Sequence, residues 1–203
     1  EDAQARGLKV EAILHSVNVA SDAKTPQMLA PVADCMKKSI HKALQTLDQQ
    51  KIEAVECQGL GVAQSDAIEV QSLLDVYSER QNDNLPMSSH KSYFGQLRVT
   101  SGFISLAKQI VSCQNHELYK TPFVNQPRQL ISNNTSTSSS LRSSVALQTQ
   151  KLKNQNPILA VSTFGVGGLS GHILLSSFDK SMYAKNENNI GRVAELQVST
   201  GKE

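Results

Sequence analysis

The sequence contains no tryptophan, and aromatic residues make up only 4% of it. A surface that stacks nucleic-acid bases on aromatic rings is therefore not expected. The net charge is +2 at pH 7, and no block of lysines and arginines stands out, which also argues against a nucleic-acid partner. No apolar run approaches the roughly 20 residues that a membrane-spanning helix needs, so no span is predicted.

Cysteine is also scarce. Cys35, Cys57 and Cys113 are widely spaced, odd in number and form no C-x-x-C pair, which favours reduced thiols and a cytoplasmic setting. The five histidines show no metal-ligand spacing, so no metal site is predicted. The N-terminus is not a signal peptide and lacks an initiator methionine, and we expect the chain to come from a longer protein.

What is present suits a folded domain: 39% of the residues are apolar and 19% are charged in a chain of 203. The apolar spacing predicts strands alternating with helices, and this order indicates a layered α/β fold with a mixed sheet. Helices are expected from Leu29, from Asp66 and over Gly102–Cys113. Strands are expected over Leu8–Val19, Ile52–Cys57, Ser89–Phe94, Pro157–Phe164 and His172–Phe178, the last two forming an antiparallel hairpin.

Two segments lack this periodicity. Residues 114–157 are predicted to be irregular and include a serine-rich loop, Ser132–Ser144, within a domain that spans residues 1–180. Residues 181–203 are predicted to be a polar tail or linker, apart from a short strand over Val193–Val198.

The chain is organised around Ile52–Tyr77, a strand, a glycine turn and an amphipathic helix. Asp66 is predicted to be the N-cap of this helix, with Glu69 completing a capping box. The turn Gly59-Leu60-Gly61 invites a dinucleotide-binding interpretation, but Gln64 stands where that fingerprint needs a third small residue, so the signal is weak.

Cys57, at the end of the strand, has the position of a nucleophile. A catalytic thiol needs a base or a positive field to lower its pKa, and no histidine is close in sequence. A buried structural role is favoured for Cys57. His172 begins an apolar strand and is likewise interpreted as a structural histidine.

Four motifs occur in an order that resembles β-ketoacyl synthases. Glu56–Val62 and Ser65–Glu69 resemble the Glu-Ala-His-Gly-Thr-Gly-Thr and Gly-Asp-Pro-Ile-Glu parts of one family motif, and Lys91–Gln96 resembles Lys-Ser-Asn-Ile-Gly-His. Val161–His172 is similar to the family's Ser-Ser-Phe-Gly-Phe-Gly-Gly-Thr-Asn-Ala-His run, and Ser16-Val17-Asn18 to its Ser-Ala-Val-Asn. The resemblance covers residues 8–178.

This resemblance implies the C-terminal half of a thiolase-like fold, with layered αβαβα architecture and a mixed five-stranded sheet in this half. It also implies that the nucleophilic cysteine lies in an N-terminal half that this sequence does not contain. The family's glycine-rich segment would contribute to substrate binding. In this sequence that segment consists of Phe164, Gly165, Val166, Gly167 and Gly168.

The departures from the family bear on the chemistry. The two family histidines are replaced by Gln58 and Gln96, whereas the lysine that supports the second histidine is retained as Lys91. An imidazole exchanges protons near neutral pH, but a glutamine amide only donates and accepts neutral hydrogen bonds. Val166 replaces a phenylalanine that gates the active site in the family. No catalytic residue is therefore assigned.

The combination resembles a chain-length factor: a catalytically silent module that dimerises with an active ketosynthase and shapes the acyl-chain tunnel in polyketide or polyunsaturated fatty acid synthesis. Its expected partners are that ketosynthase, its own N-terminal half and an acyl carrier protein, whose phosphopantetheine thioester carries the substrate. No cofactor is expected to bind directly. Two alternatives stay open: a divergent β-ketoacyl synthase, acyltransferase or malonyl decarboxylase with an upstream nucleophile, and a free-standing small-molecule binding domain.

Overall fold

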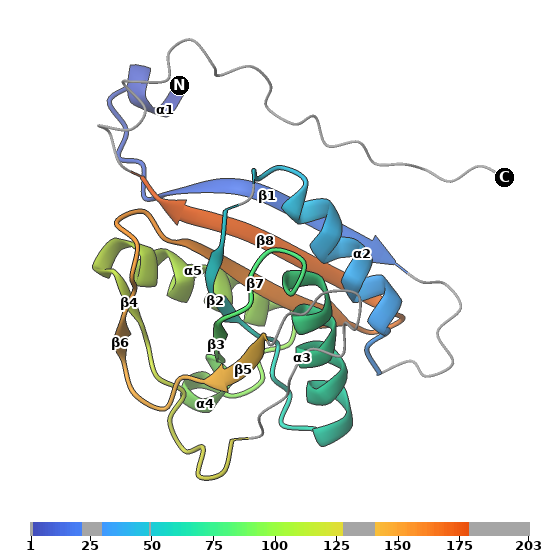
Figure 1. The fold of residues 1–203 in the computed structure, drawn as a ribbon. Coiled ribbons are helices and arrows are strands. Elements are labelled where there is room, and N and C mark those ends of the chain that lie inside the picture. Colours follow the sequence, from blue (N-terminus) through green and yellow to red (C-terminus); the bar gives the residue numbers. More distant parts are fainter. Residues whose placement is uncertain (1, 22–29, 49, 128–140, 179–203) are drawn as a thin grey trace, which may run out of the picture.

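The structure is a computed structural model that describes residues 2–21, 30–48, 50–127 and 141–178 (Figure 1). The helices are α1 (Asp2–Ala5), α2 (Ala33–Leu44), α3 (Ala63–Tyr77), α4 (Lys91–Phe94) and α5 (Thr100–Asn115). The strands are β1 (Ala12–Ser21), β2 (Ile52–Glu56), β3 (Asn84–Ser88), β4 (Glu117–Leu118), β5 (Arg142–Val145), β6 (Gln150–Lys151), β7 (Ile158–Gly165) and β8 (Leu169–Ser177).

The main sheet has six strands in the order β1-β8-β7-β2-β3-β5. Strand β8 runs antiparallel to both of its neighbours, and the other pairs are parallel. The predicted mixed sheet and the β7–β8 hairpin are confirmed. The predicted number of five strands is wrong, because β5 adds a sixth strand beside β3.

Helices α2 and α3 lie on one face of the sheet and α5 lies on the other (Figure 1). Side chains alternate between the two faces along each strand. Val55 and Ala160 pack in the larger core under α2 and α3, whereas Ala54 and Leu159 pack in a smaller core with residues of α5. The layered α/β class predicted from the order of elements is therefore confirmed.

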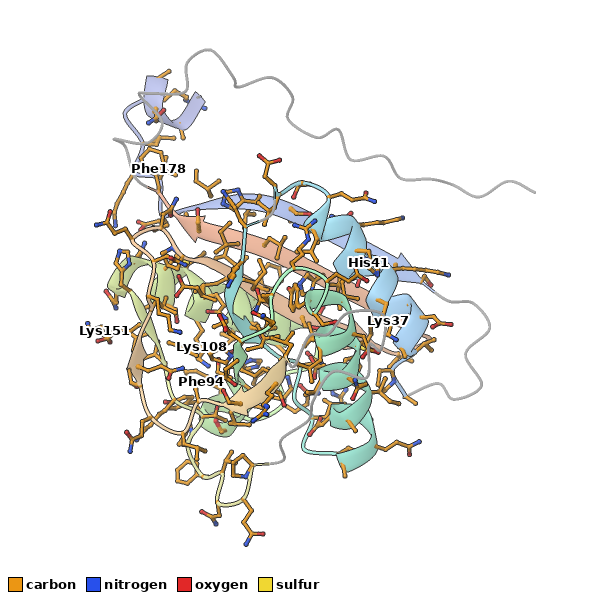
Figure 2. The ribbon with its side chains drawn as sticks, in the orientation of Figure 1. Lys37, His41, Phe94, Lys108, Lys151 and Phe178 are labelled. Atoms are coloured by element: carbon orange, nitrogen blue, oxygen red, sulfur yellow. The ribbon has the colours of Figure 1, made fainter. Side chains whose placement is uncertain are left out.

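Surface ion pairs join the two helices that share a face. Lys37 and His41 project from α2 (Figure 2). Lys37 Nζ lies 2.7 Å from Asp75 Oδ2 of α3, and His41 Nδ1 lies 3.9 Å from Glu79 Oε2 just beyond α3. Such exposed pairs contribute little individually, so the apolar core holds these helices together.

The third strand is not where the sequence pattern placed it. The prediction of a strand over Ser89–Phe94 is wrong: strand β3 precedes it, and Lys91–Phe94 form the short helix α4. Leu85 and Met87 are buried in β3, and Met87 pairs with Val55 of β2. A helical turn then begins at once, because the Phe94 N–H donates to His90 O at 3.1 Å.

The segment predicted to be irregular, residues 114–157, contains regular structure. Strand β5 pairs with β3, and β4 pairs with β6 in a separate two-stranded sheet. Arg142–Ser144, the end of the serine-rich tract, lies in β5, so the expectation of a loop is wrong there. The rest of the tract up to residue 140, the predicted strand Val193–Val198 and the tail 181–203 lie outside the described residues. The domain boundaries stay predictions.

Helix α5 confirms the helix predicted over Gly102–Cys113, but it is not buried all round. The side facing the sheet carries the buried polar residues Ser101, Ser105 and Gln109, flanked by Leu106 and Ile110, which pack against the smaller core. Its outward side carries Phe103, Ala107 and Val111, which recur every four residues and are exposed. A surface helix normally carries polar residues on its outward side, so this exposed apolar stripe is unusual.

Candidate functional site

The turn after β2 is held by two carboxylates from α3. Glu69 accepts hydrogen bonds from the backbone N–H groups of Gln58 at 2.7 Å and Gly59 at 2.9 Å. Asp66 accepts from the N–H groups of Leu60 at 2.9 Å and Gly61 at 3.0 Å. Four consecutive amides therefore point at two acidic side chains, which fixes the path of the turn.

Glycine is required at the first position of this turn. Gly59 has a φ of +48°, a conformation that residues with a Cβ rarely adopt. A Cβ there would also lie 3.0 Å from Ser89 Oγ. Gly59 thus allows the close approach of the turn to the β3–α4 connection.

The predicted capping arrangement of α3 is wrong. The helix begins at Ala63, and its N-cap residue is Val62, which makes no side-chain cap. Asp66 and Glu69 instead reach back beyond the helix to the turn. Both carboxylates lie near the helix N-terminus, where the helix dipole also favours negative charge.

This geometry disfavours the dinucleotide interpretation. Phosphate binding at a strand–turn–helix junction uses free backbone N–H groups and a positive local field. Here the amides of Gly59, Leu60 and Gly61 already donate to carboxylates of this chain. The acidic side chains would repel a pyrophosphate from the same position.

The ionisable groups around the turn have perturbed pKa values. Burial raises the pKa of Glu69 to about 7, although its two backbone hydrogen bonds oppose the shift. Burial also raises the pKa of Asp66. Burial lowers the pKa of Lys91, which the nearby Glu69 and Glu56 oppose. Among the described residues, Lys91 Nζ has no hydrogen-bond partner although the atom is buried.

A cavity of about 530 Å³ lies between the turn, α3, the β3–α4 connection and β5. Lys91, Asp66 and Glu69 are part of its lining. The apolar part of the lining includes Leu60, Ala67, Val70, Met87, Val124 and Val145. A volume of this size is typical of small-molecule pockets, which combine apolar walls with a few polar groups.

The sequence-predicted site residues lie at different places relative to this cavity. Lys91 lines it, whereas Gln58 and Gln96 do not. Gln58 is 8% exposed, next to the lining residues Cys57 and Gly59, and Gln96 is exposed and accepts a hydrogen bond from Ser101 Oγ at 2.9 Å. The segment predicted to bind substrate, Phe164–Gly168, forms the end of β7 and the hairpin turn, away from the lining.

A buried ionic cluster lies beneath the site, and the sequence patterns did not predict it. Glu56 is fully buried and accepts from Lys108 Nζ at 2.7 Å, from Ser88 Oγ at 2.6 Å and from the backbone N–H of His90. Figure 2 labels Lys108, which comes from α5. Burial alone would raise the pKa of Glu56, but His90 and Lys108 lower it below its usual value.

His90 belongs to the same cluster. Its Nδ1 lies 3.3 Å from Glu56 Oε1 and 3.0 Å from Ser105 Oγ of α5. The imidazole is fully buried and does not line the cavity. The cluster therefore joins β2, the β3–α4 connection and α5.

Cys57 and His172 are both buried, as predicted from the sequence. Cys57 is 6% exposed, and burial raises the pKa of its thiol well above the usual value, which opposes nucleophilic reactivity. His172 Nε2 lies 2.7 Å from Tyr77 Oη in the core. Burial lowers the pKa of His172 to about 3, so this imidazole is neutral at pH 7.

Among the described residues, no group of three or more histidine, cysteine, aspartate or glutamate side chains is arranged to hold a metal ion. None of the helices in the described ranges is long and apolar enough to cross a membrane.

Comparison with known proteins identifies the family. Residues 11–125 match the family described as beta-ketoacyl synthase, C-terminal domain. The chain belongs to this ketosynthase family. The match contains the glycine turn, Lys91 and both glutamines, whereas the motif over Val161–His172 lies outside it.

The curated relatives of this ketosynthase domain are large synthases. The chain is 25% identical over 202 residues to erythronolide synthase EryA2 of Saccharopolyspora erythraea, covering 98% of this chain and 6% of that protein. It is 27% identical over 204 residues to the pikromycin polyketide synthase component PikAII of Streptomyces venezuelae, with 98% and 5% covered. The chain thus spans a small part of each relative.

Solved structures share the ketosynthase fold. Ketosynthase twelve of the bacillaene polyketide synthase of Bacillus amyloliquefaciens gives a TM-score of 0.75 at 23% identity, covering 88% of this chain and 32% of that one. The PfaC keto synthase–chain length factor gives 0.76 at 22% identity, with 88% and 19% covered. These likenesses establish a thiolase-like ketosynthase fold, in which this chain is the C-terminal domain.

Proposed function

We propose that this ketosynthase domain belongs to a catalytically silent module of the chain-length-factor kind, which pairs with an active ketosynthase and shapes the tunnel for the growing acyl chain. The observation that carries the proposal is the presence of Gln58 and Gln96 at the two family histidine positions. Proton exchange near neutral pH needs a group such as imidazole, and an amide does not supply it.

No other histidine takes over these positions in the described structure. All five histidines are described, and none lines the cavity beside Lys91. His90 is nearest to Lys91 in sequence, but it is buried against Glu56 and Ser105. The turn therefore carries a glutamine, and no imidazole, at the first family histidine position.

The exposed apolar stripe of α5 supports the proposal that a further folded partner covers this surface. Val17 and Val19 of β1 add exposed apolar surface on the same face of the sheet as α5. Val17 is paired with Ile173 of β8, and paired residues point to the same face; Ile173 packs against the smaller core beside α5. Exposed apolar surface of this extent indicates an interaction site. We assign this surface to the N-terminal half of the same module.

The other two proposed partners are an active ketosynthase and an acyl carrier protein. The active ketosynthase would supply the nucleophile, and an acyl carrier protein would deliver the substrate as a phosphopantetheine thioester. The hairpin segment Phe164–Gly168 would contribute to the wall that the acyl chain contacts. Val166 is 62% exposed there and is available for such a contact.

A second candidate is a divergent condensing or decarboxylating enzyme. It is favoured by the retention of Lys91 at the family lysine position, with its buried ammonium group close to the acidic residues Glu69 and Glu56. In this case Gln58 would polarise a thioester carbonyl through its amide.

One assay separates the two candidates. The gene product that carries this chain is incubated with malonyl- and acyl-carrier thioesters, with and without an active ketosynthase, and carbon dioxide release and condensed product are measured by mass spectrometry. The silent-module proposal expects no turnover by this protein alone and an altered product length when its Phe164 is changed to alanine in the pair. Turnover by the protein alone that is lost in Gln58→Ala would overturn the proposal in favour of the enzyme.

A further inference from the structure

Gln96, at the second family histidine position, is held by a serine of the following helix. Ser101 Oγ donates a hydrogen bond to Gln96 Oε1 at 2.9 Å. The backbone N–H of Leu97 donates to the same Ser101 Oγ at 3.1 Å. Ser101 lies in the first turn of α5 and is only 1% exposed, whereas Gln96 is exposed. A buried hydroxyl therefore contacts the side chain of an exposed glutamine.

The backbone between these two residues turns sharply. Arg98 has a φ of +55°, a left-handed conformation that is uncommon for residues with a Cβ. The Thr100 N–H donates to Leu97 O at 3.2 Å. The Ser101 N–H donates to Arg98 O at 3.1 Å. The turn brings Gln96 to the start of α5, and backbone donors already engage two carbonyl groups that lie close to Ser101 in the chain.

The hydroxyl proton of Ser101 decides the orientation of the Gln96 amide. A serine hydroxyl has one proton to donate, and its lone pairs accept. Ser101 Oγ accepts from the Leu97 N–H, so its proton needs an acceptor elsewhere, and Gln96 Oε1 supplies one. If the amide were turned round, Nε2 would face Ser101 and the buried hydroxyl proton would lose this acceptor. Leaving a buried donor without a partner is costly, so the observed orientation is favoured.

This orientation leaves the amide nitrogen of Gln96 available. Within the part of the chain that the structure describes, Gln96 Nε2 makes no hydrogen bond, since the contact of this side chain runs through Oε1. An imidazole at the same position could donate or accept, depending on its tautomer. With its oxygen turned toward Ser101, Gln96 presents N–H donors instead.

We propose that Ser101 is a positioning residue for Gln96: its buried hydroxyl holds the amide oxygen toward α5, so that the second family histidine position presents a fixed pair of N–H donors. The inference goes beyond the proposed function, because it holds for a silent and for a catalytic module alike. It gives a role to a serine that lies outside the family motifs found in the sequence.

Nuclear magnetic resonance of the 203-residue chain, labelled with nitrogen-15, tests the proposal. Ser101→Ala removes the hydroxyl, and the heteronuclear NOE of Gln96 Nε2 should fall to less than half its value in the unaltered chain. Ser105→Ala is the matched control. It removes another fully buried hydroxyl, one turn further along α5 and in contact with His90, and should leave the NOE of Gln96 Nε2 unchanged. Both variants lose a buried hydrogen bond, so a general loss of stability would affect Gln96 in both.

A second measurement uses the unaltered chain and keeps the test decisive if Ser101→Ala does not fold. The Nε2 protons of Gln96 should give no strong proton–proton NOE to the β protons of Ser101, because the amide oxygen faces Ser101. Such a strong NOE overturns the proposal. So does a heteronuclear NOE of Gln96 Nε2 that is unchanged in a folded Ser101→Ala or falls equally in Ser105→Ala; circular dichroism checks the fold of each variant. Turnover in the carrier-protein assay does not bear on this result, so the two proposals fail separately.

Discussion

The backbone N–H of Gln58 donates a hydrogen bond to Glu69 Oε1 at 2.7 Å. The residue at the first family histidine position is thus fixed by its main chain rather than by its side chain. The acid that holds it comes from α3, in the second half of the same family motif. The fold of the turn can therefore outlast the loss of the histidine.

Glu69→Gln tests how this acid contributes to stability. The pKa of Glu69 is about 7 in the folded chain and 4.5 as its ordinary value, so the folded state binds more protons between these two values. The free energy of unfolding should then fall as the pH rises from about 4.5 to about 7 relative to Glu69→Gln, which lacks this titration. Urea unfolding at pH 5 and pH 7.5 measures the difference.

The glutamine amide in Glu69→Gln also lowers the stability of the folded chain directly. It offers one acceptor to two backbone donors, so Glu69→Gln should lose about 1 kcal/mol at pH 5. Asp34→Asn, at an exposed acid of α2, is the control for removing an acid elsewhere on the surface. A pH-independent difference between the unaltered chain and Glu69→Gln would show that Glu69 is ionised throughout the range.

Lys108→Met tests the buried cluster. The Glu56 carboxylate is fully buried and would lose its cationic partner, which lies 2.7 Å away. Breaking a buried ion pair from one side costs about 3 kcal/mol or more, because the remaining charge is left uncompensated. Urea unfolding at pH 7 should show this loss, and the double variant Glu56→Gln with Lys108→Met should recover part of it. A double variant that is as unstable as the sum of both single changes would mean that the two side chains act independently.

Gly171→Ala tests a directly paired position in the β7–β8 hairpin. Gly171 lies opposite Thr163, and a Cβ on Gly171 would meet Thr163 Oγ1 at 2.9 Å. The change should destabilise the chain by about 1 kcal/mol, as overpacking does, and Thr163→Ala should relieve it in the double variant. Thermal unfolding of the three variants measures this. Equal melting temperatures for Gly171→Ala and the unaltered chain would show that the threonine hydroxyl turns aside at no cost.

His172→Gln tests the buried histidine. The pKa of His172 is lowered to about 3 by burial, from an ordinary value of 6.5. The unfolded chain therefore binds more protons between these values, and stability should be lost as the pH falls from about 6.5 toward 3. His172→Gln should flatten this acid dependence while its amide oxygen accepts from Tyr77. The exposed His41→Gln is the matched control and should keep the acid dependence of the unaltered chain.

The sequence predicted most of the architecture because the relevant patterns are local. The helical spacing after Leu29 predicted α2, and the two apolar runs around glycines 165–168 predicted the β7–β8 hairpin. Strand β3 was missed because only Leu85 and Met87 are its buried apolar residues, with Pro86 between them. The adjacent aromatic residues Tyr93 and Phe94 suggested a strand but form a helical turn.

The site was predictable only where family motifs contain its residues. The motif matches drew attention to Gln58, in Glu56–Val62, and to Lys91, in Lys91–Gln96. The Glu56–Lys108 pair joins residues 52 positions apart, and no local spacing reveals such a contact. Asp66 looked like a helix cap in the sequence, yet the tight turn brings backbone amides to it from before the helix.

The position of β1 in the sheet also governs the order in which the chain folds. Strand β1 hydrogen-bonds within the sheet to β8, with Ala12 opposite Ser177, so the first of the described strands pairs with the last of them. Contacts between residues far apart in the sequence close a large loop and form slowly. A ribosome would release β1 long before β8 exists, leaving an apolar edge to be shielded during synthesis. Pulse-labelled hydrogen exchange during refolding should find the β7 amides protected before those of β1; simultaneous protection would mean that the sheet forms in one step.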